Sequence, residues 1–198
     1  MEQIFVDQIA LALVAWSAIY ISDYYLTIYA ARLYRTAAQD HFSLQGSYEL
    51  TPYYQKDVNA LKLVSARFVA MLVLSGLLIA LIWFLSVKVI FFPELYLLTL
   101  GGLMLREAAV HLRHVRNIAT FRLSRSPGAV EGRVVYSRPF SLRLSAVELL
   151  TFAMFCLLLS LVVGSWFVLG GALACGVLAV QHWRLAIKVS AQSQSIAH

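Results

Sequence analysis

Long apolar runs divide this sequence into five segments, and polar residues or turn signals separate each segment from the next. A helix satisfies its backbone hydrogen bonds internally, and about 20 residues cross the hydrocarbon core of a bilayer. The pattern therefore predicts an all-α fold, a polytopic transmembrane helix bundle that forms one membrane domain over residues 1–198. The predicted spans cover residues 4–31, 68–91, 95–112, 144–163 and 166–189, and the third helix continues to about residue 123.

Two short connections support this count of five spans. Pro93 lies between the second and third spans, and Gly164 precedes Ser165 between the fourth and fifth. Proline is common at the start of a helix and glycine just after its end, so both positions are typical of tight turns. Four spans are the alternative, in which the third apolar run is re-entrant or lies at the membrane surface.

Composition and charge add an orientation to this pattern. The chain is 61% hydrophobic and 13% charged, whereas a soluble domain is about 25% charged. Five spans place 15 of the 16 lysines and arginines at one membrane face, with Lys88 as the exception. Lysine and arginine favour the cytoplasmic side. We therefore expect an outside N-terminus, a cytoplasmic C-terminus, and cytoplasmic loops over residues 35–63 and 124–140. The first loop has room for a short helix, and Val134 to Tyr136 for a strand or hairpin.

The expected partners follow from the same charges. Basic loops beside a membrane bind anionic lipid headgroups, and no nucleic-acid-binding motif accompanies these arginines, so we expect no nucleic acid partner. A chain of this size also fits a homo-oligomer or a complex with other membrane subunits.

Two carboxylates in the predicted spans are candidates for catalysis. An aspartate at the centre of a span costs about 2.5–3.5 kcal/mol, and such residues usually face the protein interior. Asp23 lies in the first span, on a helical face with Ala12, Thr27 and Ala30, and Glu148 lies near the cytoplasmic end of the fourth. Asp23 and Glu148 are the residues that we expect to activate water, if the protein is an enzyme.

The stretch LREAAVHLRHVRN, residues 105–117, predicts a metal site. Glu107, His111 and His114 recur at i, i+4 and i+7, which places them on one helical face. The arginines of this stretch point to another side, which suits lipid headgroups or an acidic partner. Carboxylates and imidazoles bind zinc, iron or manganese, so these three residues and His182 on the last span are the candidate ligands. A solvated helix end with ordinary histidines is the simpler interpretation.

The predicted topology places all six of these titratable residues in the cytoplasmic half of the membrane. His41 and Glu49 lie in the first cytoplasmic loop and are candidates for a cap over this polar layer.

This layer supports four functions. The first is binding of a metal ion or protons by a small transporter or channel-like subunit, and it needs the fewest assumptions about geometry. The second is an intramembrane metal-dependent hydrolase. The third is a non-catalytic subunit of a larger membrane complex. The fourth is a b-type haem protein in which His111 or His114 lies opposite His182.

One motif resembles a known pattern. Asp23-x-x-x-Thr27, followed by Gly46-x-x-Glu49-x-Thr51-Pro52, resembles the D-x-x-x-T … G-x-x-E-x-N-P pattern of small uncharacterised bacterial polytopic membrane proteins. Thr51 stands where that pattern has asparagine. The resemblance covers about a quarter of the chain, implies a bacterial inner-membrane protein, and singles out Asp23 and Glu49. It implies no particular activity.

Overall fold

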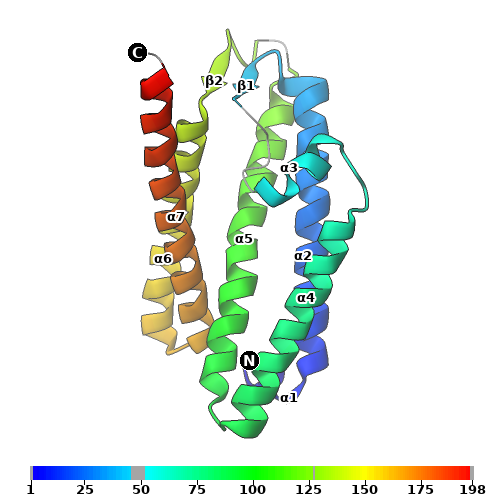
Figure 1. Ribbon diagram of the computed structural model, residues 1–198, viewed down its shortest axis with the longest axis vertical. Helices are drawn as coiled ribbons and strands as arrows, with labels where there is room; N and C mark the ends of the chain where they lie inside the picture. Colours follow the sequence, from blue (N-terminus) through cyan, green and yellow to red (C-terminus); the bar gives the residue numbers. More distant parts are fainter. Residues whose placement is uncertain (1, 46–51, 127, 197–198) are drawn as a thin grey trace.

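Five long helices dominate the computed structural model, which describes residues 2–45, 52–126 and 128–196 (Figure 1). They are α2 (Ile9–Leu33), α4 (Ala66–Trp83), α5 (Pro93–Leu123), α6 (Arg138–Val163) and α7 (Trp166–Ile196). Each is long and apolar enough to cross a membrane. The five predicted apolar helices are therefore present.

The first helix differs from its predicted bounds. The expected span began at residue 4, but the chain forms a short helix α1 (Gln3–Asp7), bends at Gln8, and begins α2 at Ile9. The sequence has neither proline nor glycine at this bend. The indole of Trp83 donates a hydrogen bond to the carbonyl of Val6 at 2.8 Å, so packing against the end of α4 holds α1 across the bundle.

The π-helical turns η1 (Tyr34–Ala38) and η2 (Phe84–Val89) extend α2 and α4. The short turn after η2 contains Phe91 at φ 58°, and Pro93 begins α5. At the other end of the bundle, Ser137 caps α6 by accepting a hydrogen bond from the Phe140 amide. α6 begins at Arg138, six residues before the predicted start of the fourth span. Its first turn therefore lies within the segment expected to be a loop.

α5 is the central helix, with the α6–α7 pair on one side and the α2–α4 pair on the other (Figure 1). Glycines allow α5 and α7 to approach at backbone distance. A Cβ on Gly101 would lie 1.8 Å from the carbonyl oxygen of Phe167, and one on Gly170 would lie 1.9 Å from that of Leu98. Small residues at such a seam replace side-chain packing with direct contact between backbones.

Outside the five-helix bundle, the described parts of the two long loops contain two short strands and one short helix. Strands β1 (Phe42–Leu44) and β2 (Val134–Tyr136) pair in parallel and connect the two long loops. The strand at Val134 to Tyr136 matches the sequence prediction, but its partner β1 was not predicted. The first loop also carries the helix α3 (Pro52–Asn59), as expected for a short helix in that loop.

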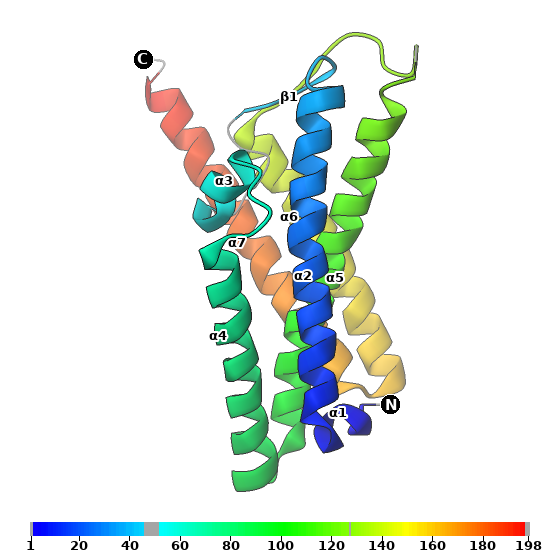
Figure 2. The same ribbon diagram turned by 90° about the vertical axis from the view of Figure 1, so that its right-hand side faces the viewer.

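The two paired loops and the C-terminal end of α7 lie at one end of the bundle, and the N-terminus lies at the other (Figures 1 and 2). We call the end with the two paired loops the loop end. Large apolar side chains on α4 and α6 face outward, including Leu77, Leu81, Phe155 and Leu158. In a bilayer such a surface is solvated by lipid.

Candidate functional site

A cavity of about 900 Å³ lies in the half of the bundle nearer the loop end. All five long helices line it, together with α3 and both strands. Its volume is near the upper end of the range for small-molecule sites, about 300–1,000 Å³. α3 lies near the loop end of α4 (Figures 1 and 2). There the phenol oxygens of Tyr20 on α2 and Tyr54 on α3 are 2.7 Å apart.

The cavity wall changes from apolar to polar along the helices. Trp16, Leu78, Leu103 and Leu178 line the part farther from the loops. Arg113 follows Leu103 by ten residues on α5, which is about 15 Å along a helix. The wall nearer the loops is rich in charge, and its ionisable side chains other than tyrosine are Asp23, Arg106, Glu107, Arg113, His114, Arg116, Arg138, Glu148 and His182. The cavity is therefore amphipathic along the direction of the bundle axis.

Asp23 lies between two histidines of α5. Its Oδ1 is 3.6 Å from Nδ1 of His111 and 3.6 Å from Nε2 of His114. The structure brings these three residues together, whereas the sequence predicted only that they lie in one layer and that Asp23 faces another helix. The Asp23 side chain is 22% exposed and lines the cavity, so it is accessible to a ligand there.

Hydrogen bonds to neighbouring groups fix both imidazoles. For His111, Nε2 is 2.6 Å from the Ser22 hydroxyl and Nδ1 is 2.8 Å from the Glu107 carbonyl oxygen. For His114, which is buried, Nε2 is 3.0 Å from the Thr27 hydroxyl. The pair therefore joins α5 to α2 through a polar network.

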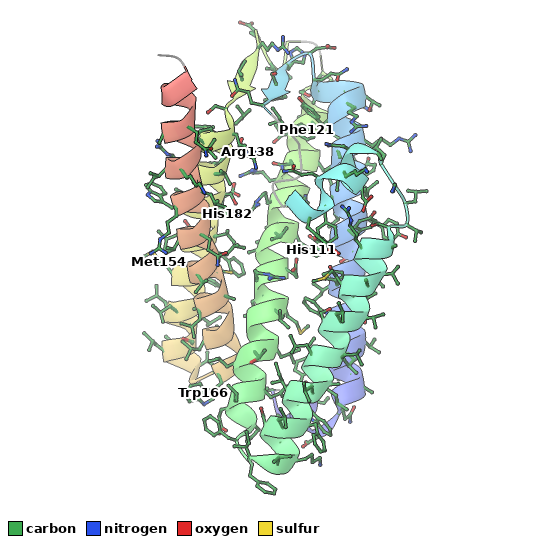
Figure 3. All side chains as sticks on the ribbon, in the orientation of Figure 1. His111, Phe121, Arg138, Met154, Trp166 and His182 are labelled. Carbon is green, nitrogen blue, oxygen red and sulfur yellow. The ribbon has the colours of Figure 1, made fainter. Side chains whose placement is uncertain are left out.

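The remaining predicted residues have different partners. Glu107 is buried and forms an ion pair with Arg106. Glu148 accepts a hydrogen bond from Nε of Arg113 at 3.1 Å and also forms an ion pair with Arg116. The Nδ1 atom of His182 is 2.8 Å from the Ser145 hydroxyl on α6 (Figure 3).

The arginines of α5 lie closer to the predicted site than their helical positions indicate. Arg106, Arg113 and Arg116 were expected on another side from Glu107, His111 and His114, facing lipid headgroups or an acidic partner, and all three line the cavity. Their long side chains reach around the helix, so the Cβ direction alone does not decide where the guanidinium lies. Arg138 also lines the cavity. The sequence prediction placed Arg138 in a loop, because it set the start of the fourth helix six residues too late. The cavity position of Arg138 was therefore missed.

The expected cap is partly described. Glu49, and Gly46 to Thr51 of the resemblance pattern, lie outside the described residues. His41 lies at the edge of the strand pair, with Nδ1 3.5 Å from the Gly132 carbonyl oxygen. In the described part of the chain, α3 lines the end of the cavity nearer the loops through Tyr54, Gln55 and Val58, and the strand pair lines it through Phe42, Leu44 and Tyr136.

α3 is anchored by a charged turn just before α4. The Ser65 hydroxyl donates to Oδ2 of Asp57 at 2.6 Å, and Nζ of Lys62 lies 3.0 Å from Oδ1. The hydrogen bond from Ser65, and then the interaction with Lys62, hold the pKa of Asp57 below its ordinary value. Ser65 also caps α4 by accepting from the amides of Arg67 and Phe68.

Within the described residues, no group of three or more histidine, cysteine, aspartate or glutamate side chains has a metal-binding arrangement. Of the four predicted metal ligands, His111 and His114 lie together beside Asp23, a predicted catalytic residue, whereas Glu107 and His182 have separate partners. No family model, curated protein or solved structure matches this chain.

Proposed function

We propose that this protein is an integral membrane protein that binds an amphiphilic molecule of the bilayer in the cavity between its five long helices. The observation that carries this proposal is the division of the wall, with aliphatic residues such as Leu78 and Leu103 at one end and charged residues at the other. A ligand with an apolar tail and a polar head matches both ends. A small soluble ion does not need the aliphatic part.

The test is to fill the apolar end of the cavity. Leu78 and Leu81 lie one turn apart on α4 and are 48% and 53% exposed, but only Leu78 of the two lines the cavity. The variants Leu78→Trp and Leu81→Trp add the same bulk, one inside the cavity and one facing lipid. Diacylglycerol and phosphatidylglycerol are titrated into the detergent-purified protein, and bound molecules are counted by native mass spectrometry.

Leu78→Trp is expected to weaken binding of both lipids by at least tenfold, whereas Leu81→Trp is expected to bind like the unmodified protein. If Leu78→Trp and Leu81→Trp bind both lipids equally well, the cavity is not the binding site and the proposal is wrong. Circular dichroism of the two variants shows whether each one keeps its helices.

A second candidate function is binding of protons or a cation at Asp23, His111 and His114. Asp23 Oδ1 lies 3.6 Å from a ring nitrogen of each histidine, but these residues do not form a three-ligand metal arrangement. Zinc, iron or manganese at this cluster would also be required for the proposed hydrolase chemistry, in which Asp23 or Glu148 activates water. Elemental analysis of the purified protein tests this. A near-stoichiometric metal that Asp23→Asn loses would support the site, and equal metal content in both proteins would contradict it.

The orientation that we propose places the loop end of the bundle in the cytoplasm and the N-terminus outside. The support is the positive-inside tendency, because Arg32, Arg35, Arg125 and Arg133 lie at that end of the bundle, while Lys88 lies at the opposite end. Anionic headgroups are then the partners of the basic loops, and the bacterial inner membrane is the location that the sequence resemblance suggests.

A further inference from the structure

We infer that the amphiphile carries a phosphate group and that Arg113, Arg116 and Arg138 bind it, at the level of the lipid headgroups. This inference rests on the proposed function, because it names the class of ligand for the same cavity. The argument uses the charges on the α5–α6 wall, their depth along the bundle, and the position of Arg138.

The α5–α6 wall of the cavity has more positive than negative charge. Four arginines of these two helices line it, Arg106, Arg113, Arg116 and Arg138, against two glutamates, Glu107 and Glu148. Arg106 pairs with Glu107 farther from the loop end, and Arg113 and Arg116 both approach Glu148. The other acidic side chain of the lining, Asp23, lies on α2 beside His111 and His114. An anionic group is therefore attracted to the α5–α6 side.

Arg138 is suited to bind a ligand. It lines the cavity and makes no hydrogen bond or ion pair with another residue in the described part of the chain. It is the first residue of α6, next to the positive end of the helix dipole, where a cation is unfavourable and an anion is favoured. Helix stability therefore does not explain an arginine at this position. Figure 3 shows Arg138 on the inner side of α6 and Met154 on the outer side.

The depth of these arginines matches a phospholipid headgroup. Arg113 and Arg116 lie 20 and 23 residues after Pro93, which is about 30 and 35 Å along α5. The hydrocarbon core of a bilayer is about 30 Å thick, so both guanidinium groups fall at its boundary. A phosphate held there leaves an acyl chain pointing towards Leu103, Leu178 and Leu78, along the aliphatic part of the cavity.

The planar N–H donors of a guanidinium group pair with two phosphate oxygens at once, as they do with the two oxygens of a carboxylate. A fatty acid would present one carboxylate in the place that Glu148 already occupies. The occupant to which we commit is therefore a glycerophospholipid with a net negative headgroup, such as phosphatidylglycerol.

The experiment replaces Arg138 and compares lipids with and without phosphate. Arg138→Gln removes a cavity guanidinium at the start of α6, and Arg133→Gln removes an exposed arginine of the loop before β2 that does not line the cavity. Each purified protein is titrated with phosphatidylglycerol and with diacylglycerol, and bound lipid is counted by native mass spectrometry. Glycerol 3-phosphate is added in excess as a competitor that lacks acyl chains.

Arg138→Gln is expected to weaken phosphatidylglycerol binding about tenfold, as for a lost charge-assisted hydrogen bond, and to leave diacylglycerol binding unchanged. Arg133→Gln is expected to change neither. Equal affinity of the unmodified protein for both lipids, with no effect of Arg138→Gln, overturns the phosphate assignment, and the Leu78→Trp result then still decides whether the cavity binds lipid at all. Displacement by glycerol 3-phosphate overturns the lipid assignment and identifies a soluble phosphate ligand.

Discussion

The Thr27 hydroxyl on α2 lies 3.0 Å from Nε2 of His114 on α5, in a buried position between the two helices. The same hydroxyl donates to the Asp23 carbonyl oxygen one turn earlier. Thr27 and His114 therefore connect the α2–α4 pair to the central helix at the level of the polar layer. This connection places Asp23 against His111 and His114. It also joins α2 to α5 where both helices line the cavity.

Thr27→Val is expected to destabilise the protein by about 1 kcal/mol, because the change keeps the shape of the side chain and removes one hydrogen-bond partner of a buried imidazole. The matched control is Thr99→Val on α5, whose hydroxyl donates only to the Leu95 carbonyl oxygen and is exposed. Thermal unfolding in detergent measures both variants. Equal midpoints for the two would contradict a role of the Thr27 hydroxyl in holding α2 to α5.

The close approach of α5 and α7 predicts different effects on stability for two glycine substitutions on α7. A Cβ at Gly170 would lie 1.9 Å from the Leu98 carbonyl oxygen, whereas one at Gly176 on the same helix would come no nearer than 4.0 Å to the Ala153 Cβ. Gly170→Ala must therefore separate the helices, at a cost of roughly 1–3 kcal/mol or more. Gly176→Ala is expected to be neutral or stabilising, since alanine favours a helix by up to about 1 kcal/mol over glycine. If Gly170→Ala and Gly176→Ala lower the unfolding midpoint equally, the close contact between α5 and α7 at Gly170 is contradicted.

The turn between α3 and α4 is expected to weaken in acid. The pKa of Asp57 is lowered in the folded protein by Ser65 and then Lys62, from an ordinary value of 3.8. A lowered carboxyl pKa stabilises the fold above the ordinary value, and this contribution is lost as pH falls through the folded pKa. Amide exchange of residues 57–68, corrected for the intrinsic rate, should therefore accelerate below about pH 4. In Asp57→Asn this segment should exchange faster at neutral pH and lose its acid dependence.

The sequence was sufficient to predict the five apolar helices, because length and hydropathy alone decide whether a helix can span a bilayer. Helical periodicity also placed Glu107, His111 and His114 on one face of the third helix and Asp23 on the inner face of the first, but it did not show which of these residues meet. The sequence did not predict the bend at Gln8 or strand β1, because tertiary contacts stabilise both. The Trp83 indole contacts α1, and the pairing partner of Phe42 to Leu44 lies about 90 residues away in the sequence.

The arginines of α5 show where periodicity is insufficient. Cβ directions separate Arg113 from Glu107 and His114, so the sequence left either lipid headgroups or an acidic partner as the neighbour of Arg113. The structure shows its guanidinium at Glu148 on α6, inside the cavity. A long flexible side chain turns towards the nearest carboxylate when the alternative is hydrocarbon. Identifying that carboxylate requires knowing which helices are neighbours, and this information is not contained in the periodicity of a single helix.

Cysteine labelling tests the proposed orientation. The two native cysteines, Cys156 and Cys175, are buried, so they give little background with a membrane-impermeant maleimide. Phe91 is 80% exposed in the turn before α5, and Glu131 is exposed in the loop before β2, at the opposite end of the bundle. Phe91→Cys should react in intact cells, because the proposed orientation places this turn outside. Glu131→Cys should react only after the membrane is made permeable, because a cytoplasmic loop is shielded from the reagent.

The reverse labelling pattern would contradict the proposed orientation. It would place the basic loops outside, against the charge bias on which the orientation rests.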